Sequence, residues 1–279
     1  MKDGLLRLLR IGAATWVGLA LLLVLAETRL VYAGAGLPGN ALPDASSRLP
    51  WDTVRVAPAS GPPVFLLAIQ APEAASEAPW VLYFHGNGER LGSPGSVGRY
   101  RLLREIGLNV LAVEYRGYGM AESAGAPSEE GLHRDALVAW RHFTHDQGVD
   151  AGRILIYGWS LGSGVAVRLA STVDPAGLVT EAAFTSVPDV ARSVVPFLPV
   201  GLLMRNRFEN LEQAPAVTVP WLLFHGRGDR QVPFAHAGRL AARAAHPLVV
   251  PLDAGHDDGV TAAWTTASRA LERFARTVF

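Results

Sequence analysis

Short apolar runs recur along the chain between residues 64 and 252, and polar residues, glycine or proline bound each of them. Such runs are typical of strands buried in a parallel sheet, because helices cover both faces of that sheet. The pattern predicts an early strand at residues 64–69 and buried parallel strands at residues 81–84, 110–115, 154–157, 178–184, 221–224 and 248–252.

Helical periodicity fills the gaps between these strands. One apolar stripe runs through residues 132–143, with Ser128 in position to cap its helix, and another runs through residues 264–278. Both stripes have the spacing of three and four residues that places side chains on one helix face. Because strands and helices alternate, the sequence predicts an α/β fold with a mostly parallel central sheet flanked by helices.

The stretch at residues 185–219 breaks this alternation. It is long for a connection in a compact domain, and residues 194–204 within it are apolar. Long connections of this kind often cover a functional site. We therefore predict a short cap or lid here; the alternative is a helix that packs into the core in the ordinary way.

A separate apolar segment lies at the N-terminus. Residues 11–26 carry no charge, whereas residues 1–10 hold three basic side chains and one acid. As a helix the segment would rise about 24 Å, short of a hydrocarbon core of roughly 30 Å unless residues 5–9 extend it. The basic excess predicts a cytoplasmic N-terminus and a domain outside. A signal peptide cleaved after Val31 and Ala33 is the alternative to an anchor. The segment lacks a polar face, which argues against an amphipathic helix.

Composition limits the function classes. The chain has 279 residues, a formal net charge of zero and no cysteine. A neutral chain lacks the basic footprint of a nucleic-acid-binding protein, and without cysteine there is no disulfide or thiolate site. No metal-ligand spacing stands out, so we expect neither a metal nor a cofactor.

The predicted organisation has three parts. Residues 1–33 form the membrane anchor or signal peptide, residues 34–60 form a linker and the start of the domain, and residues 61–279 form the catalytic domain with its lid at about residues 185–219. Two stretches are rich in alanine, proline, glycine and serine. They are predicted to be a spacer at residues 34–50 and a hairpin loop at residues 71–79.

Residues 158–162 read G-x-S-x-G and directly follow the apolar run at residues 154–157. The glycines allow a sharp turn that exposes the hydroxyl of Ser160, and the helix that follows directs its N–H groups and its dipole at the same point. The pattern indicates the nucleophile of a serine hydrolase. The alternative is a glycine-rich turn in a non-catalytic α/β protein.

Two further predicted strands end in partners for Ser160. Asp229 follows the strand at residues 221–224, and His256 follows the strand at residues 248–252. Because parallel strands end at a common edge, we expect these side chains to meet there. The histidine would take the serine proton, and the carboxylate would fix the imidazole tautomer. The order serine, acid, histidine is that of α/β-hydrolases.

Alternatives exist for the acid. Asp229 also suits a turn, and residues 227–229 match a cell-adhesion tripeptide. Asp257 and Asp258 directly follow His256 and compete for the acid position. We interpret them instead as the N-cap and first-turn charges of the helix that begins near Trp264.

Residues 80–88 form an apolar strand that runs into a glycine turn. Acyl transfer needs two N–H donors for the developing oxyanion, one after the nucleophile and one from the loop after an early strand. The candidates are the backbone N–H groups of Leu161 and Asn87. His85 and Gly86 would shape the turn.

Five motifs carry a resemblance to a known family. They are His85-Gly86-Asn87-Gly88, Tyr115-Arg116-Gly117-Tyr118-Gly119, Pro127-Ser128-Glu129-Glu130-Gly131-Leu132, the G-x-S-x-G motif, and His225-Gly226-x-x-Asp229. Over roughly residues 60–279 the chain resembles the single-pass membrane-anchored α/β-hydrolase-domain proteins, which include depalmitoylase-like, lysophospholipase-like and bacterial serine aminopeptidase-like members. The resemblance implies the α/β-hydrolase fold, a triad of Ser160, Asp229 and His256, and ester or thioester hydrolysis. One departure is Glu114, where relatives usually carry aspartate; its extra methylene bears on a pairing with Arg116.

The sequence thus predicts a membrane-anchored serine hydrolase that acts on a small-molecule or lipid-like acyl substrate. An uncleaved anchor that contacts the membrane through residues 11–26 is favoured, because the proteins it resembles are typically anchored in this way. Apolar residues of the lid would line an acyl pocket or touch the bilayer. The alternatives are a peptidase or amidase with the same triad, and a non-catalytic binding module on the cell surface.

Overall fold

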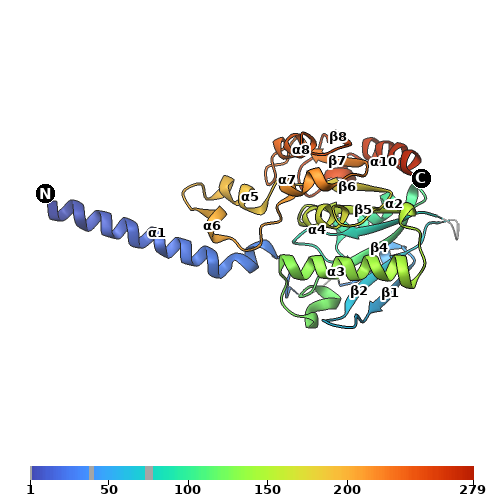
Figure 1. Ribbon diagram of the computed structural model, residues 1–279, viewed down its shortest axis with the longest axis horizontal. Helices are drawn as coiled ribbons and strands as arrows, with labels where there is room; N and C mark the ends of the chain where they lie inside the picture. The colour runs from blue at the N-terminus through green and yellow to red at the C-terminus, as the bar shows by residue number, and fades with distance from the viewer. Residues whose placement is uncertain (1, 38–40, 73–77) are drawn as a thin grey trace.

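The computed structural model describes residues 2–37, 41–72 and 78–279, and it consists of a long N-terminal helix that leads into a layered α/β domain (Figure 1). The hairpin loop predicted at residues 71–79 falls largely outside the described residues, as does part of the spacer predicted at residues 34–50.

The described residues build a sheet of eight strands in the order β1-β2-β4-β3-β5-β6-β7-β8. The strands are β1 Trp51–Val56, β2 Val64–Ile69, β3 Trp80–Phe84, β4 Asn109–Glu114, β5 Ile154–Trp159, β6 Gly177–Glu181, β7 Trp221–Gly226 and β8 Pro247–Leu252. β2 is antiparallel to both of its neighbours, and the remaining pairs are parallel. The predicted α/β class with a mostly parallel sheet is therefore confirmed.

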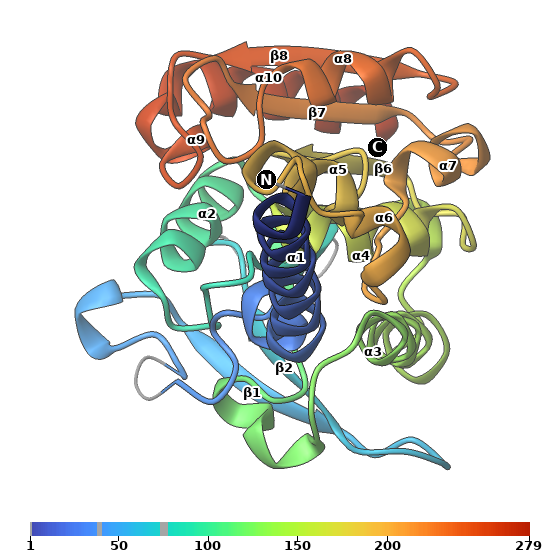
Figure 2. The ribbon, with the colours of Figure 1, turned by 90° about the vertical axis from the view of Figure 1, so that its left-hand side faces the viewer.

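The longer helices cover both faces of the sheet. They are α2 Pro94–Glu105, α3 Glu129–Arg141, α4 Leu161–Ala170, α5 Val187–Val194, α8 Ala235–Ala241 and α10 Trp264–Val278, and the shorter ones are α6 Val200–Leu203, α7 Asn210–Gln213 and α9 Gly259–Ala262. Side chains of α2, α9 and α10 pack in one apolar cluster, and those of α3, α4 and α8 in another. Figure 2 shows α2 and α3 on opposite sides of the sheet.

Both predicted helical stripes form helices. α3 begins after Ser128, whose hydroxyl accepts a hydrogen bond from the Gly131 N–H at 3.1 Å. α10 buries Ala267, Leu271 and Phe274 against the sheet. Side-chain caps of this kind satisfy an N–H that has no partner within the helix.

Residues 34–60 are the segment predicted to contain a linker and the start of the domain. β1 lies within it and pairs with β2 along its whole length. Apolar and polar residues do not alternate regularly in β1, because an edge strand leaves much of its surface in solvent. Before β1, the N–H of Gly34 donates to the Asn87 carbonyl at 2.8 Å, and that of Gly36 to the Gly117 carbonyl at 2.9 Å. The chain is thus packed on the domain directly after the first helix rather than spaced away from it.

α1 spans Lys2–Val31 and projects from the domain (Figure 1). Its stretch Asp3–Val31 is long and apolar enough to cross a membrane, with a mean hydropathy of 2.1 in its most apolar window. This helix is longer than the run at residues 11–26, so it rises about 43 Å at about 1.5 Å per residue.

The cap, defined here as residues 185–219, contains α5, α6 and α7 between β6 and β7. In both views α5 and α6 lie beside the C-terminal half of α1 (Figures 1 and 2). An insertion at this point lies over the C-terminal ends of the parallel strands.

Candidate active site

Ser160 occupies the sharp turn between β5 and α4. Its backbone has φ 50° and ψ −117°, a conformation that side chains rarely adopt. The flanking glycines explain how the turn is tolerated, because a Cβ at Gly158 would lie 2.3 Å from the Gly162 carbonyl oxygen. A Cβ at Gly162 would lie 2.1 Å from the carbonyl oxygen of Phe84 on β3. Strain of this kind is typical of functional turns, and here it holds the hydroxyl away from the sheet.

Leu161 is the first residue of α4, so its N–H has no partner within the helix. The dipole of α4 adds partial positive charge at the same point. Both favour negative charge developing next to Ser160.

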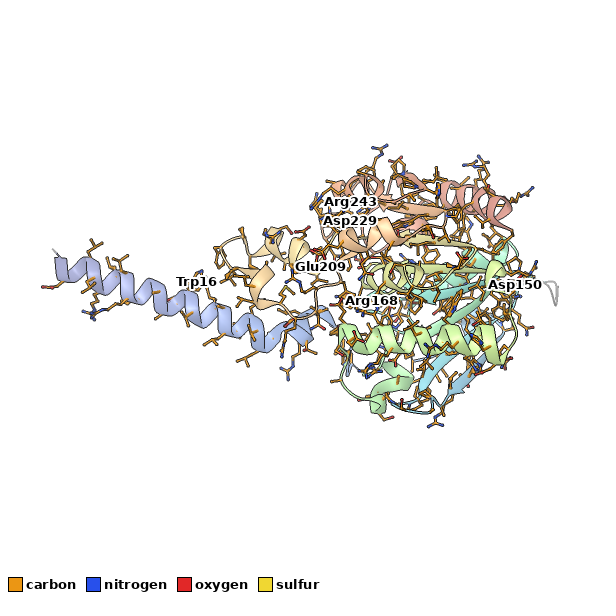
Figure 3. All side chains as sticks on the ribbon, viewed as in Figure 1. Trp16, Asp150, Arg168, Glu209, Asp229 and Arg243 are labelled. Atoms are coloured by element: carbon orange, nitrogen blue, oxygen red, sulfur yellow. The ribbon has the colours of Figure 1, made fainter. Side chains whose placement is uncertain are left out.

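The side chains of Ser160, His256 and Asp229 form a continuous hydrogen-bonded chain. The Ser160 Oγ lies 2.9 Å from His256 Nε2, and His256 Nδ1 lies 2.7 Å from Asp229 Oδ2. Asp229 follows β7 and His256 follows β8, so adjacent strand ends supply the two groups. Figure 3 labels Asp229 on the side of the domain that faces the cap. The structure therefore brings together the three side chains that the sequence singled out.

The environment of Asp229 favours its ionised form. Burial opposes this, but the hydrogen bond from His256 and the N–H of Val232 together lower the pKa of the Asp229 carboxyl. Since the folded-state pKa is depressed, the associated stabilisation is present above the ordinary pKa of a carboxyl group and is lost as the pH falls through the lowered value. Asp229 is thus a carboxylate at neutral pH.

His225 supports the turn that carries Asp229. It is fully buried, and its Nε2 lies 2.7 Å from the Val232 carbonyl. Burial lowers the pKa of His225, so the ring is neutral and donates to that carbonyl. Its place in the His225-Gly226-x-x-Asp229 motif was the only sequence signal for this function.

The Asn87 turn is held by side chains from the next loop. Tyr118 donates its hydroxyl hydrogen bond to the Asn87 carbonyl at 2.9 Å, and Tyr115 donates to the His85 carbonyl at 2.8 Å. His85 Nε2 lies 3.0 Å from a carboxylate oxygen of Glu114, and both side chains are fully buried. The Tyr-Arg-Gly-Tyr-Gly motif thus shapes the loop that presents Asn87.

Glu114 pairs with His85, and Arg116 has a different partner. Arg116 binds the carboxylate of Asp135 on α3 through Nε at 2.8 Å and through Nη2 at 2.5 Å. The pairing between Glu114 and Arg116 that the sequence raised is therefore not the one that forms.

Asp257 and Asp258 do not approach the imidazole as Asp229 does. Asp258 Oδ1 accepts the Gly255 N–H at 2.9 Å, and no side-chain cap bond precedes α9 or α10. Asp258 occupies the N-cap position of α9 without a side-chain bond, whereas Ala263 occupies that position before α10. The predicted role of the two carboxylates at the start of the last helix is therefore wrong, because α9 lies between them and Trp264. The carboxylate of Asp258 instead closes the loop that contains His256.

A buried ion pair holds the segment after His256 in place. Arg99 on α2 binds the carboxylate of Glu181 through Nε and Nη2, both at 2.7 Å, and its guanidinium lies 3.5 Å from the ring centroid of Trp159. Glu181 also accepts the Val260 N–H at 2.9 Å. One carboxylate at the end of β6 thus ties α2 to the segment after His256.

We expect Arg99→Met to lower the free energy of unfolding by about 3–5 kcal/mol, because it leaves the Glu181 carboxylate buried without its charged partner. Chemical denaturation of the purified protein would measure the loss. Arg101→Met is the matched control on the same helix; Arg101 is exposed, so a cost below about 1 kcal/mol is expected. Equal losses for the two variants would contradict the assignment.

A cavity of about 320 Å³ lies over Ser160. Its walls include Asn87, Leu161 and His256, and the rest is mostly aliphatic side chains of α1 and the cap. A second cavity of about 400 Å³ contains none of the predicted site residues, so volume alone does not identify the site. Within the described residues, no group of three or more His, Cys, Asp or Glu side chains is placed to hold a metal ion.

A mostly parallel sheet with a serine at the sharp turn between a central strand and a helix defines an α/β-hydrolase. The chain belongs to the family of the uncharacterized protein MT2364 of Mycobacterium tuberculosis, to which it is 32% identical over 252 residues, covering 83% of this chain and 81% of that protein. No family model matches the sequence.

Two further comparisons agree with this class. The chain is 32% identical over 188 residues to lysophosphatidylserine lipase ABHD12 of Danio rerio, covering 61% of this chain and 48% of that protein. It thus spans about half the length of this relative. The Pyrococcus furiosus esterase Pf2001 superposes with a TM-score of 0.68 at 17% identity, covering 86% of this chain and 98% of that one. The predicted α/β-hydrolase fold and the resemblance to α/β-hydrolase-domain proteins are confirmed.

Proposed function

We propose that the protein is a membrane-anchored serine hydrolase that cleaves carboxylic ester or thioester bonds of acyl substrates. The observation that carries the proposal is the hydrogen-bonded chain from Ser160 through His256 to Asp229. This chain provides a nucleophile, a base and a group that orients the base, which are the three parts that nucleophilic acyl transfer needs.

The mechanism has two halves. Ser160 Oγ attacks the acyl carbonyl carbon while His256 Nε2 takes the hydroxyl proton, and the N–H groups of Leu161 and Asn87 stabilise the resulting oxyanion. His256 then gives its proton to the departing alcohol or thiol, which leaves an acyl ester on Ser160. In the second half His256 takes a proton from water, the hydroxide attacks the acyl ester, and the acid leaves as Ser160 regains its proton.

The cavity supports a substrate with an aliphatic acyl group. Its lining is mostly valine, leucine and methionine, and its polar residues are Asn87, Ser160, Gln231 and His256. Such a pocket places an acyl chain along the apolar walls and its carbonyl at the serine. The name of the lipase relative supports a lipid-like ester as the substrate. The proposed catalytic unit is residues 61–279, with the cap at residues 185–219 as its lid, and the preceding segment contributes β1 to its sheet.

The N-terminal helix is proposed to be an uncleaved anchor through residues 11–26, with the domain on the non-cytoplasmic side. A signal sequence has similar length and composition, so these two properties do not distinguish it from an anchor. The contacts at the C-terminal end of the helix favour the anchor. Glu27 and Tyr32 are buried against the domain, and their side chains both bind Asn206. Cleavage near Ala33 would remove these contacts from the folded protein.

The full-length protein in salt-washed membranes tests the proposal. We expect hydrolysis of p-nitrophenyl esters, with activity retained in the membrane fraction and much lower activity on aminoacyl anilides, because an amide leaving group demands stronger protonation by His256. Preferred cleavage of the anilides would favour a peptidase. No turnover of either class would favour a binding module, and a mature N-terminus near Gly34 would refute the anchor.

A further inference from the structure

The cavity over Ser160 is not enclosed by the hydrolase domain alone. Leu23, Leu30 and Val31 of α1 line it on one side, and the side chains of α5 line it on another. An anchor that served only to tether the domain would have no reason to contribute to this wall. The end of α1 is therefore part of the wall of this cavity.

Specific polar contacts fasten α1 to the cap. Glu27 is 1% exposed, and its carboxylate accepts the backbone N–H groups of Arg205 at 2.8 Å and of Asn206 at 2.7 Å. The hydroxyl of Tyr32 donates to Asn206 Oδ1 at 2.8 Å. A buried carboxylate without such donors would destabilise the fold. These hydrogen bonds therefore fix the position of α1 relative to the cap.

A further contact lies much farther along the helix. The indole N–H of Trp16 donates to the carbonyl of Phe197 in the cap at 2.9 Å. Figure 3 shows Trp16 about midway along α1, beside the cap. Trp16 and Val31 are separated by about 22 Å along the helix axis at about 1.5 Å per residue. The cap therefore follows α1 well into the segment that the anchor proposal places in the membrane.

The outer surface of the cap suits that environment. Phe197 and Leu202 are 58% and 89% exposed, and no charged residue occurs at residues 194–204. This surface continues onto the exposed leucines of α1, such as Leu22 at 61%. Exposed apolar surface of this extent is unfavourable in water and favourable in hydrocarbon.

Resting on the proposed function, we propose that α1 and the cap together form a membrane-embedded wall of the pocket, through which the enzyme takes the acyl chain of a bilayer lipid directly from the leaflet next to the domain. The acyl chain of the lipid enters between α1 and α5, and its carbon atoms stay in apolar surroundings throughout. Leu23 then limits the length of acyl chain that the pocket accepts when the ester carbonyl is at Ser160.

A substitution at Leu23 tests the wall. The full-length protein in phosphatidylcholine vesicles is assayed with p-nitrophenyl butyrate and p-nitrophenyl palmitate. We expect Leu23→Trp to lower the palmitate-to-butyrate ratio of kcat/KM at least about tenfold, since a few methylenes displaced from an apolar pocket have effects of this size. Leu23→Ala should raise the ratio. Leu22→Trp, one residue away on the exposed face, should leave it at the wild-type value.

Labelling by diisopropyl fluorophosphate distinguishes a failure of the proposed hydrolase activity from a failure of the proposed pocket wall. A wild-type protein that is neither labelled nor active on either ester would refute the hydrolase itself. A labelled protein in which Leu23→Trp and Leu22→Trp shift the ratio equally, or not at all, would refute the pocket wall alone.

The position of the cap in the bilayer is tested by fluorescence. Because the chain contains no cysteine, Leu202→Cys offers a single attachment point for a fluorophore. We expect brominated lipids in the vesicles to quench this label, and not a label at Thr265→Cys, which is exposed on α10. Equal quenching at both sites, absence of quenching at Leu202→Cys, or cross-linking of two chains through it would overturn membrane immersion of the cap.

Discussion

Ser160→Ala is expected to lower kcat for ester hydrolysis by on the order of 10⁴ to 10⁶-fold and to abolish labelling by a fluorophosphonate. The hydroxyl is the only group that the substitution removes, because alanine keeps the Cβ and meets the same backbone cost at φ 50°. The fold should therefore survive while the nucleophile is lost. Single-turnover kinetics and gel-based labelling of the purified full-length protein would measure both effects.

Ser163→Ala is the matched control for this prediction. Ser163 lies in the first turn of α4 and is fully buried, and its hydroxyl has no hydrogen-bond partner among the described residues. Removing it should leave labelling and kcat close to wild type, since no bond is broken. Wild-type labelling of Ser160→Ala, or a loss in Ser163→Ala as large as that in Ser160→Ala, would require another nucleophile.

Asp229→Asn should lower kcat by about 10⁴-fold, the size of the effect of the same change in a serine protease. Asp229 Oδ2 accepts the Nδ1 proton of His256, which leaves Nε2 free to take the serine proton. An amide can present its own N–H to Nδ1 instead and thereby favour the wrong tautomer. The amide still accepts the Val232 N–H through Oδ1, so the turn itself should remain.

Asp257→Asn and Asp258→Asn should each change kcat by less than about tenfold, because tautomer control would not depend on them. Asp258 Oδ1 binds the Gly255 N–H, and an asparagine oxygen can accept the same bond. Kinetics on the three variants, each checked by circular dichroism, would decide between the acids. Near-normal turnover of Asp229→Asn with loss in either neighbour would reassign the acid.

Several features were predictable because their signals are local in the chain. The strand predicted at residues 64–69 matches β2, since a run of apolar residues reports burial without knowledge of a partner. The turn around Ser160 was predictable because the close approach of backbone to Gly158 and Gly162 excludes every larger residue. Asp229 and His256 were predictable because parallel strands end at one edge, so sequence order alone brought them near Ser160.

Other features depend on pairs of segments that are far apart in the chain. β1 was missed because its burial comes from β2 and not from its own alternation. The partner of Arg116 is Asp135, and that of Glu114 is His85, choices that the packing of separate loops and helices determines. No motif in the sequence indicates which of several oppositely charged side chains will lie within hydrogen-bonding distance of Arg116 or Glu114 after folding.

The N-terminal helix shows the same division most clearly. Its sequence determined that residues 11–26 are uncharged and apolar, because hydropathy is a property of one segment. The structure extended this run into a helix, within which Asp3–Val31 is long enough to cross a membrane. Only the tertiary structure decided that Glu27 is buried against residues 205–206 and that Leu23 lines the cavity over Ser160. The contacts of Glu27 join residues 178 and 179 positions apart, and such contacts leave no periodic pattern in either segment.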